Sequence, residues 1–136
     1  MKHLPILLPL AMLLTGCASP APKNFSAEVI PAPTRPMLTV YVTTDDALVQ
    51  MDAETYVTGV VAGEIPGDWP MEALRAQAIL ARTFVLKFIT EKTSRYPGAD
   101  ISTDVAEAQA YDAAAVNERI RQAVASTAGM VLLTED

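Results

Sequence analysis

The stretch of residues 51–92, MDAETYVTGVVAGEIPGDWPMEALRAQAILARTFVLKFITEK, decides the fold. Its first part predicts a helix that opens at Asp52, a residue type that commonly caps helix N-termini. Apolar residues recur at helical spacing, and Glu64 extends their stripe by one step before Ile65-Pro66-Gly67 ends the helix. A second helix starts near Pro70 and is apolar on most sides, which is typical of a buried helix. We therefore expect two packed helices joined by a short break, with one carboxylate at the join.

The residues on either side of this helical pair predict an α+β fold. Residues 37–43 alternate apolar and polar side chains and a return strand follows at 47–51, so a β-hairpin leads into the first helix. Residues 104–115 are ambiguous, because they are rich in alanine but follow a loop. A third helix is predicted over 118–127 and a short apolar strand over 130–133. The expected order is a β-hairpin, a buried helical pair, a third helix and a short terminal strand.

The chain before residue 37 is predicted to be a targeting segment and a tether. The apolar run at 4–14 follows a basic start, is too short to span a membrane as a stable helix, and has the layout of a secretory signal. It ends in Leu14-Thr15-Gly16-Cys17, which resembles a bacterial lipobox and implies cleavage before Cys17 and lipidation of that residue. The alternative is a plain cleaved signal with an incidental cysteine. Prolines dominate the next stretch, which predicts an extended tether.

The predicted organisation is therefore a signal peptide over 1–16, a lipidated Cys17 with its tether over 17–36, and a domain over 37–136. The residue after Cys17 is Ala18 and not an Asp, a pattern that resembles sorting to the outer rather than the inner membrane. We expect a lipid-anchored protein of the cell envelope, on the periplasmic face of the outer membrane if the source is Gram-negative.

Composition excludes several kinds of chemistry. Cys17 is the only cysteine, and once lipidated it leaves no thiol for a disulfide, a zinc site or a nucleophile. His3 is the only histidine, so acid–base work in the domain must fall to carboxylates, Tyr or Lys. The net charge of -6 argues against nucleic acid and against binding anionic lipid through a basic face. We expect no cofactor, no metal, and no membrane contact beyond the lipid.

Glu64 is the best-placed carboxylate for acid–base chemistry. It ends an apolar stripe, where burial favours the protonated form of a carboxyl group. It also lies at a predicted helix C-terminus, where the helix dipole disfavours negative charge. The alternative is a solvated glutamate at a helix end, which is the commoner case.

Two blocks around Glu64 carry a resemblance to a known family. Residues 56–66 read YVTGVVAGEIP and residues 69–84 read WPMEALRAQAILARTF, and together they resemble the stage II sporulation protein D and amidase-enhancer family (SpoIID/LytB). Residues 100–111 and 120–131 resemble the next two blocks of that family. The resemblance covers about the N-terminal half of the family domain. We therefore expect a C-terminally truncated domain, without the glycine-rich segments that complete the family's cleft.

The resemblance implies an envelope lipoprotein that acts on peptidoglycan. Family members resemble lytic transglycosylases that cleave glycan strands stripped of their peptide stems, or proteins that enhance an amidase. The family's catalytic glutamate falls in the block matched by Glu64, which would protonate the glycosidic oxygen and then take the proton of the sugar's 6-hydroxyl. The alternatives are a non-catalytic glycan-binding or amidase-enhancing lipoprotein, and an inactive fragment. The expected partners are peptidoglycan glycan strands and a wall amidase.

Four further polar residues are candidates for binding the substrate. Gln77 and Arg82 lie on the otherwise buried helix, where they either serve Glu64 and sugar hydroxyls or satisfy a buried partner. Gln109 and Tyr111 either line a sugar groove, with Tyr111 stacking on a ring, or are half-buried packing residues. Some family members bind zinc in this region through Cys and His, but residues 102–108 contain neither.

Overall fold

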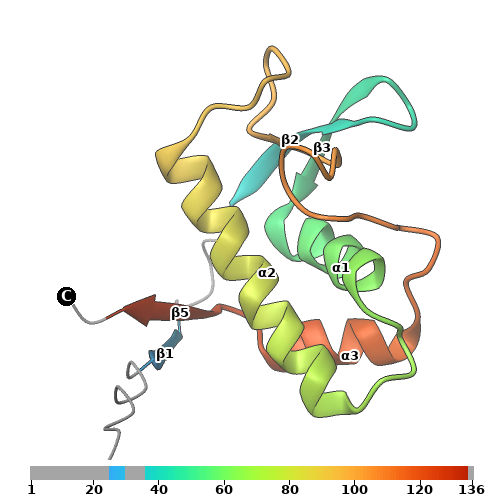
Figure 1. Ribbon diagram of the computed structural model, residues 1–136, viewed down its shortest axis with the longest axis vertical. Helices are drawn as coiled ribbons and strands as arrows, with labels where there is room; N and C mark the ends of the chain where they lie inside the picture. Colours follow the sequence, from blue (N-terminus) through green and yellow to red (C-terminus); the bar gives the residue numbers. More distant parts are fainter. Residues whose placement is uncertain (1–24, 30–35, 135–136) are drawn as a thin grey trace, which may run out of the picture.

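The computed structural model describes residues 25–29 and 36–134, which form the mixed α+β fold expected from the sequence. The predicted signal peptide, Cys17 and most of the tether lie outside the described residues. The elements, in chain order, are β1 (Phe25–Val29), β2 (Met37–Val42), β3 (Ala47–Asp52), α1 (Ala53–Glu64), α2 (Met71–Glu91), β4 (Ile101–Ser102), α3 (Glu118–Ser126) and β5 (Met130–Thr134). Figure 1 shows α2 running the length of the molecule, with the β2–β3 hairpin at one end and α3 at the other.

The strands form two small sheets. In the first, β2 pairs antiparallel with β3 and parallel with β4, and the predicted hairpin is confirmed. In the second, β1 pairs antiparallel with β5. Neither β1 nor β4 was expected. Strand β4 is only two residues long, and β1 falls within the expected tether, so both depend on pairing with strands that are distant in the sequence.

The expected helix starts are confirmed by their capping contacts. The Asp52 side chain accepts a hydrogen bond from the Thr55 backbone N–H at 3.1 Å, which satisfies one of the free donors at the start of α1. The Asn117 side chain does the same for the Ile120 N–H at 2.9 Å at the start of α3. Helix α2 begins directly after Pro70. The ambiguous residues 104–115 form no helix and cross the molecule as a loop.

The core lies where the three helices meet the β2–β4 strand pair. Its fully buried side chains come from every one of these elements, and they include Tyr56, Val57, Val60 and Val61 of α1, Leu74, Ala78, Ala81 and Val85 of α2, Ile120 and Ala123 of α3, and Leu38, Val40 and Ile101 of the strands. Each large apolar side chain that is fully buried contributes about 1.5–3 kcal/mol relative to an exposed one. The core therefore fixes where both ends of α1 lie.

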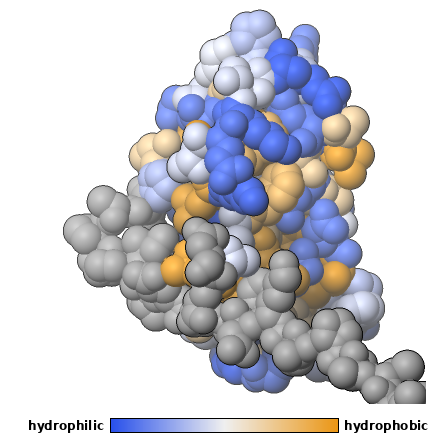
Figure 2. Space-filling view, turned by 60° about the vertical axis from the view of Figure 1, so that its left-hand side comes forward, coloured by the Kyte–Doolittle hydropathy of each residue, from blue (hydrophilic) through white to orange (hydrophobic). Residues whose placement is uncertain are grey.

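Helix α2 is buried on one side rather than on most sides. Leu80 is 49% exposed, so the buried stripe is narrower than its apolar sequence predicts. Figure 2 shows apolar residues reaching the surface between hydrophilic ones on this side of the molecule. A groove of about 580 Å³ runs between α2 and β5, with Leu86, Leu132 and Leu133 among its lining residues. Within the described residues, no helix combines the length and the apolar character needed to cross a membrane.

Candidate active site at the end of helix α1

Glu64 is the last residue of α1, and its side chain is exposed. The expected burial is wrong, because α1 ends at this residue and its side chain stays exposed. Its Oε1 accepts a hydrogen bond from the Ala110 backbone N–H at 2.8 Å, across 46 residues of sequence. Within the described part of the chain, Oε2 has no hydrogen-bond partner. One oxygen is thus held in place while the other is available.

Two glycines on α1 allow the loop that carries Ala110 to lie against the helix. A Cβ atom at Gly63 would stand 2.7 Å from the Ala110 carbonyl carbon, and one at Gly59 would stand 2.2 Å from the Tyr111 ring. Both distances are shorter than any normal contact to a Cβ atom, so the close approach requires glycine. The Asp112 N–H also donates to the Gly59 carbonyl oxygen at 3.0 Å.

The same loop is anchored at its start by polar contacts. The Tyr96 hydroxyl donates to Asp104 Oδ2 at 2.7 Å, and the Ala106 N–H donates to Asp104 Oδ1 at 2.8 Å. The hydrogen bond from Tyr96, followed by that from Ala106, holds the pKa of the Asp104 carboxyl below its usual value. Glu107 accepts from the Ser94 hydroxyl and from the Arg95 N–H. These contacts therefore fix the position of the start of the loop that carries Ala110.

Tyr111 joins this loop to the core. Its ring stacks on Tyr56 with 5.5 Å between centroids and 27° between planes, and burial raises the pKa of its hydroxyl. Tyr56 is itself fully buried, and its hydroxyl donates to the Ser102 carbonyl oxygen at 2.7 Å. Tyr111 therefore has a packing role as a half-buried ring, as one of the two interpretations predicts.

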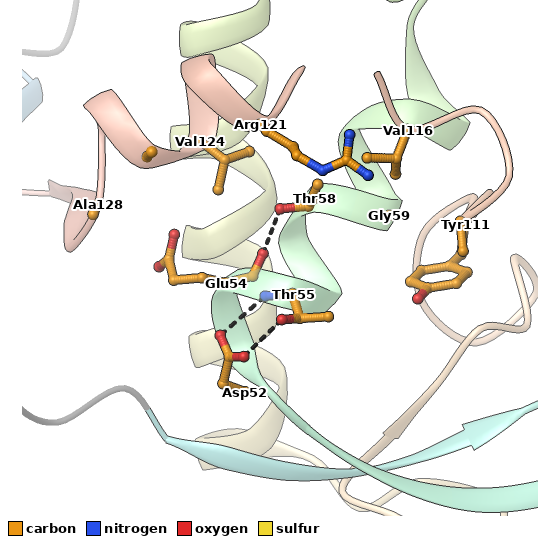
Figure 3. A pocket seen from close by; sticks show the side chains of 12 residues that line it. Asp52, Glu54, Thr55, Thr58, Gly59, Tyr111, Val116, Arg121, Val124 and Ala128 are labelled. Carbon is orange, nitrogen blue, oxygen red and sulfur yellow. Dashed lines mark hydrogen bonds between the residues drawn. The ribbon is translucent and has the colours of Figure 1, made fainter. Parts of the chain in front are cut away.

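Tyr111 also lines a cavity of about 440 Å³ beside α1. Figure 3 shows its ring next to Gly59 and the Arg121 guanidinium extending over Thr58 from α3. Such a volume falls in the range of small-molecule sites, about 300–1,000 Å³. Glu64 is not among the lining residues, so the cavity and the exposed carboxylate are separate features of the surface.

Within the described residues, neither Gln77 nor Gln109 forms a hydrogen bond with Glu64. Gln109 precedes Ala110, and its Oε1 is buried without a hydrogen-bond partner in the described residues. Gln77 is partly buried on α2, and its side chain makes no hydrogen bond within the described part of the chain. Their assignment as substrate-binding residues stays a prediction.

Arg82 is committed elsewhere, at the opposite end of α1. It is 2% exposed, and its Nε and Nη2 donate to the two carboxylate oxygens of Glu54, both at 2.7 Å. Its Nη1 donates to the Met130 carbonyl oxygen at 2.9 Å, and Nη2 lies 3.4 Å from the Val124 carbonyl oxygen. The guanidinium thus ties α1 and α2 to α3 and the start of β5, which is the buried-partner interpretation.

Sequence reasoning missed the groups that position Glu64: the Ala110 N–H and the glycines at 59 and 63. The glycine pair was the available signal, because residues four apart share one helix face. Within the described residues, no group of three or more His, Cys, Asp or Glu side chains could hold a metal ion.

The fold and the exposed glutamate define a small α+β protein with a candidate acid–base site at a helix C-terminus. The family model described as "Stage II sporulation protein" (SpoIID) matches residues 41–133, which is more than half of the chain. The chain belongs to the SpoIID family, as its two blocks around Glu64 predict.

Two curated relatives share this name. Stage II sporulation protein D of Bacillus subtilis (strain 168) is 32% identical over 127 residues, covering 84% of this chain and 37% of the relative. Stage II sporulation protein D of Bacillus amyloliquefaciens is 34% identical over 110 residues, covering 71% of this chain and 32% of the relative. The chain therefore spans about a third of the length of these relatives.

Proposed function

We propose that this protein cleaves peptidoglycan glycan strands as a lytic transglycosylase, with Glu64 as its catalytic acid and base. The observation that carries the proposal is the hydrogen bonding and exposure of the Glu64 carboxyl group. One oxygen is held by the Ala110 N–H at 2.8 Å, the side chain is exposed, and the residue lies within the region that matches the SpoIID family. A general acid needs both a fixed orientation and an oxygen that reaches the substrate.

The proposed reaction uses a single carboxyl group in two steps. Protonated Glu64 gives its proton to the glycosidic oxygen as the bond to the sugar's anomeric carbon breaks. The carboxylate then takes the proton of the same sugar's 6-hydroxyl, whose oxygen closes an anhydro ring on that carbon. No water is consumed, and the proton count on Glu64 is restored.

This route requires only one carboxyl group. A glycoside hydrolase usually pairs two carboxyl groups across the scissile bond. Glu72 pairs with Arg75 at 2.6 Å, and Asp112 accepts the Ala114 N–H at 2.9 Å. Asp68, four residues after Glu64, is exposed. The proposed reaction needs none of these three carboxylates as a nucleophile.

The test is incubation of the purified chain with glycan strands from which an amidase has removed the peptide stems. We expect products with anhydro ends, detected by mass spectrometry, and a loss of about 10³-fold in rate for Glu64→Gln, since the amide cannot supply the proton that Glu64 gives in the proposed reaction. Glu72→Gln is the matched control, an exposed glutamate on the next helix that should keep full activity. Parent protein without anhydro products would contradict the proposal.

A second candidate function is non-catalytic binding of glycan strands or of a wall amidase. The cavity beside Tyr111 and Arg121 favours it, because this cavity is lined without Glu64. A pull-down with insoluble peptidoglycan separates the two functions. Binding that Glu64→Gln retains, together with absent anhydro products, supports the non-catalytic function.

We also propose that the protein is anchored in the envelope by lipid on Cys17. The support is the sequence pattern Leu14-Thr15-Gly16-Cys17 after the apolar run. Metabolic labelling with a radioactive or clickable fatty acid should mark the parent protein and not Cys17→Ala. Equal labelling of both would contradict the anchor.

A further inference from the structure

We propose that the Ala110 backbone N–H is a positioning group that selects which oxygen of Glu64 exchanges the proton, and that Gly59 and Gly63 keep it in place. This inference rests on the proposed function. In this proposal neither segment 110–112 nor the glycine face of α1, formed by Gly59 and Gly63, contacts the substrate.

A single N–H donor beside a carboxyl group decides which of its two oxygens carries the proton. In a protonated carboxyl group one oxygen carries the hydrogen and the other is the better acceptor. The Ala110 N–H can only donate, and it lies 2.8 Å from Oε1. Oε1 therefore remains the acceptor, and the proton resides on Oε2, which has no partner among the described residues.

Keeping the proton on Oε2 serves both halves of the proposed reaction. The proton leaves Oε2 for the glycosidic oxygen, and the 6-hydroxyl later returns a proton to Oε2. Throughout, Oε1 keeps the same hydrogen bond, which strengthens when the group is charged. The carboxyl group therefore does not need to rotate between its acid and base roles.

The Ala110 N–H is held in position by contacts between segment 110–112 and α1. Segment 110–112 lies along α1 with two contacts five residues apart on the helix: Asp112 N–H to the Gly59 carbonyl oxygen at 3.0 Å, and Ala110 N–H to Glu64. Between them, the backbone of Ala110 lies against Gly63, where an added Cβ would meet its carbonyl carbon and oxygen at 2.7 and 2.8 Å. These are backbone atoms, so an added methyl group at Gly63 must displace the segment.

The sharpest experiment replaces the Ala110 amide by an ester, which removes the N–H and leaves the side chain unchanged. We expect kcat on stem-free glycan strands to fall about 10- to 100-fold with KM unchanged, since the donor orients the carboxyl group and touches no substrate. The matched control is the same replacement at Ala114, whose N–H donates to Asp112 in the same loop. This control should keep the parental kcat. Equal kcat in the Ala110 ester and the parent would overturn the proposal while leaving the proposed function intact.

A second measurement reads the contact without relying on activity. In ¹⁵N-labelled protein, the Ala110 amide proton should resonate downfield and lose that shift in Glu64→Ala. Glu64→Gln should retain most of the shift, because the amide oxygen still accepts the hydrogen bond, although its activity is lost. An Ala110 resonance that is the same in the parent and Glu64→Ala would overturn the contact.

Gly63→Ala tests the glycine face. We expect it to move the Ala110 resonance and to lower kcat about 10-fold, with a cooperative unfolding transition showing that the protein is still folded. Gly63→Ala with parental kcat and an unmoved Ala110 resonance would overturn the role of this glycine. If the parent itself is inactive, the proposed function and the catalytic role of the contact both fail, and the resonance still reports whether the contact forms.

Discussion

Helix α1 carries a carboxylate near each end, and the two differ in almost every physical respect. Glu54, at the start, has a side chain only 14% exposed, and both of its oxygens accept hydrogen bonds from Arg82 at 2.7 Å. Glu64, at the end, is exposed and has one oxygen held by one backbone N–H. Both partners come from residues distant in the sequence.

The difference shows what separates a structural carboxylate from one available for chemistry. The Arg82–Glu54 pair is largely removed from water, so each charge depends on the other and on the surrounding carbonyl oxygens. Glu64 has a free oxygen and contact with solvent, so a proton can reach it and leave it. A charged side chain on a predicted buried helix is therefore not by itself a sign of a catalytic site.

The largest expected effect comes from breaking the structural end of α1. Arg82→Met should lower the free energy of unfolding by about 3–5 kcal/mol, because it leaves the Glu54 carboxylate largely buried and unpaired. Urea denaturation followed by circular dichroism measures this loss. Adding Glu54→Leu should recover part of the lost stability, since the unpaired charge is then removed.

The control for this prediction is Arg75→Met. Its ion pair with Glu72 is on the surface, so the free energy of unfolding should change by no more than about 0.5 kcal/mol. Similar losses for Arg82→Met and Arg75→Met would remove the distinction between the buried and the exposed pair.

A smaller effect is expected from Tyr56, in the first turn of α1, whose ring supports Tyr111. Burial raises the pKa of the Tyr56 hydroxyl above its usual value of 10.0. The unfolded chain therefore loses this proton first, so the stability that the group contributes is fully present below pH 10 and falls as the pH rises further. Tyr56→Phe should flatten this decline, and at neutral pH it should cost about 0.5–1.5 kcal/mol for the lost hydrogen bond to Ser102.

Thermal or urea unfolding at a series of pH values from neutral to alkaline checks this prediction. Tyr111→Phe is the comparison variant, because the Tyr111 ring is only half-buried. An alkaline decline as steep in Tyr56→Phe as in the parent would assign the effect to other groups.

The smallest expected effect on stability comes from the functional end. Glu64→Gln should change the free energy of unfolding by less than about 0.5 kcal/mol, because the side chain is exposed and the amide oxygen can still accept the Ala110 N–H. The same urea titration measures it. A loss close to that of Arg82→Met would make Glu64 a structural residue and would weaken the comparison between the two ends.

Prediction from sequence succeeded where the signal is local. The cap at Asp52, the Pro/Gly break after Glu64 and the alternation in β2 act over a few residues, and the structure confirms the elements they indicate. It failed for β1 and β4, and for the burial of Glu64. Those features depend on which distant segment pairs with a strand or packs over a helix end.

By itself, the sequence determined the helical pair, the third helix, the hairpin and the family, since periodicity, caps and an ungapped motif are properties of adjacent residues. Only the tertiary structure decided which charged residue would be buried and which would stay available. Arg82 and Glu54 are 28 residues apart and Glu64 and Ala110 are 46 apart, so packing alone brings them together. The same helix then holds a saturated ion pair at one end and an open carboxylate at the other, because the core covers the first and not the second.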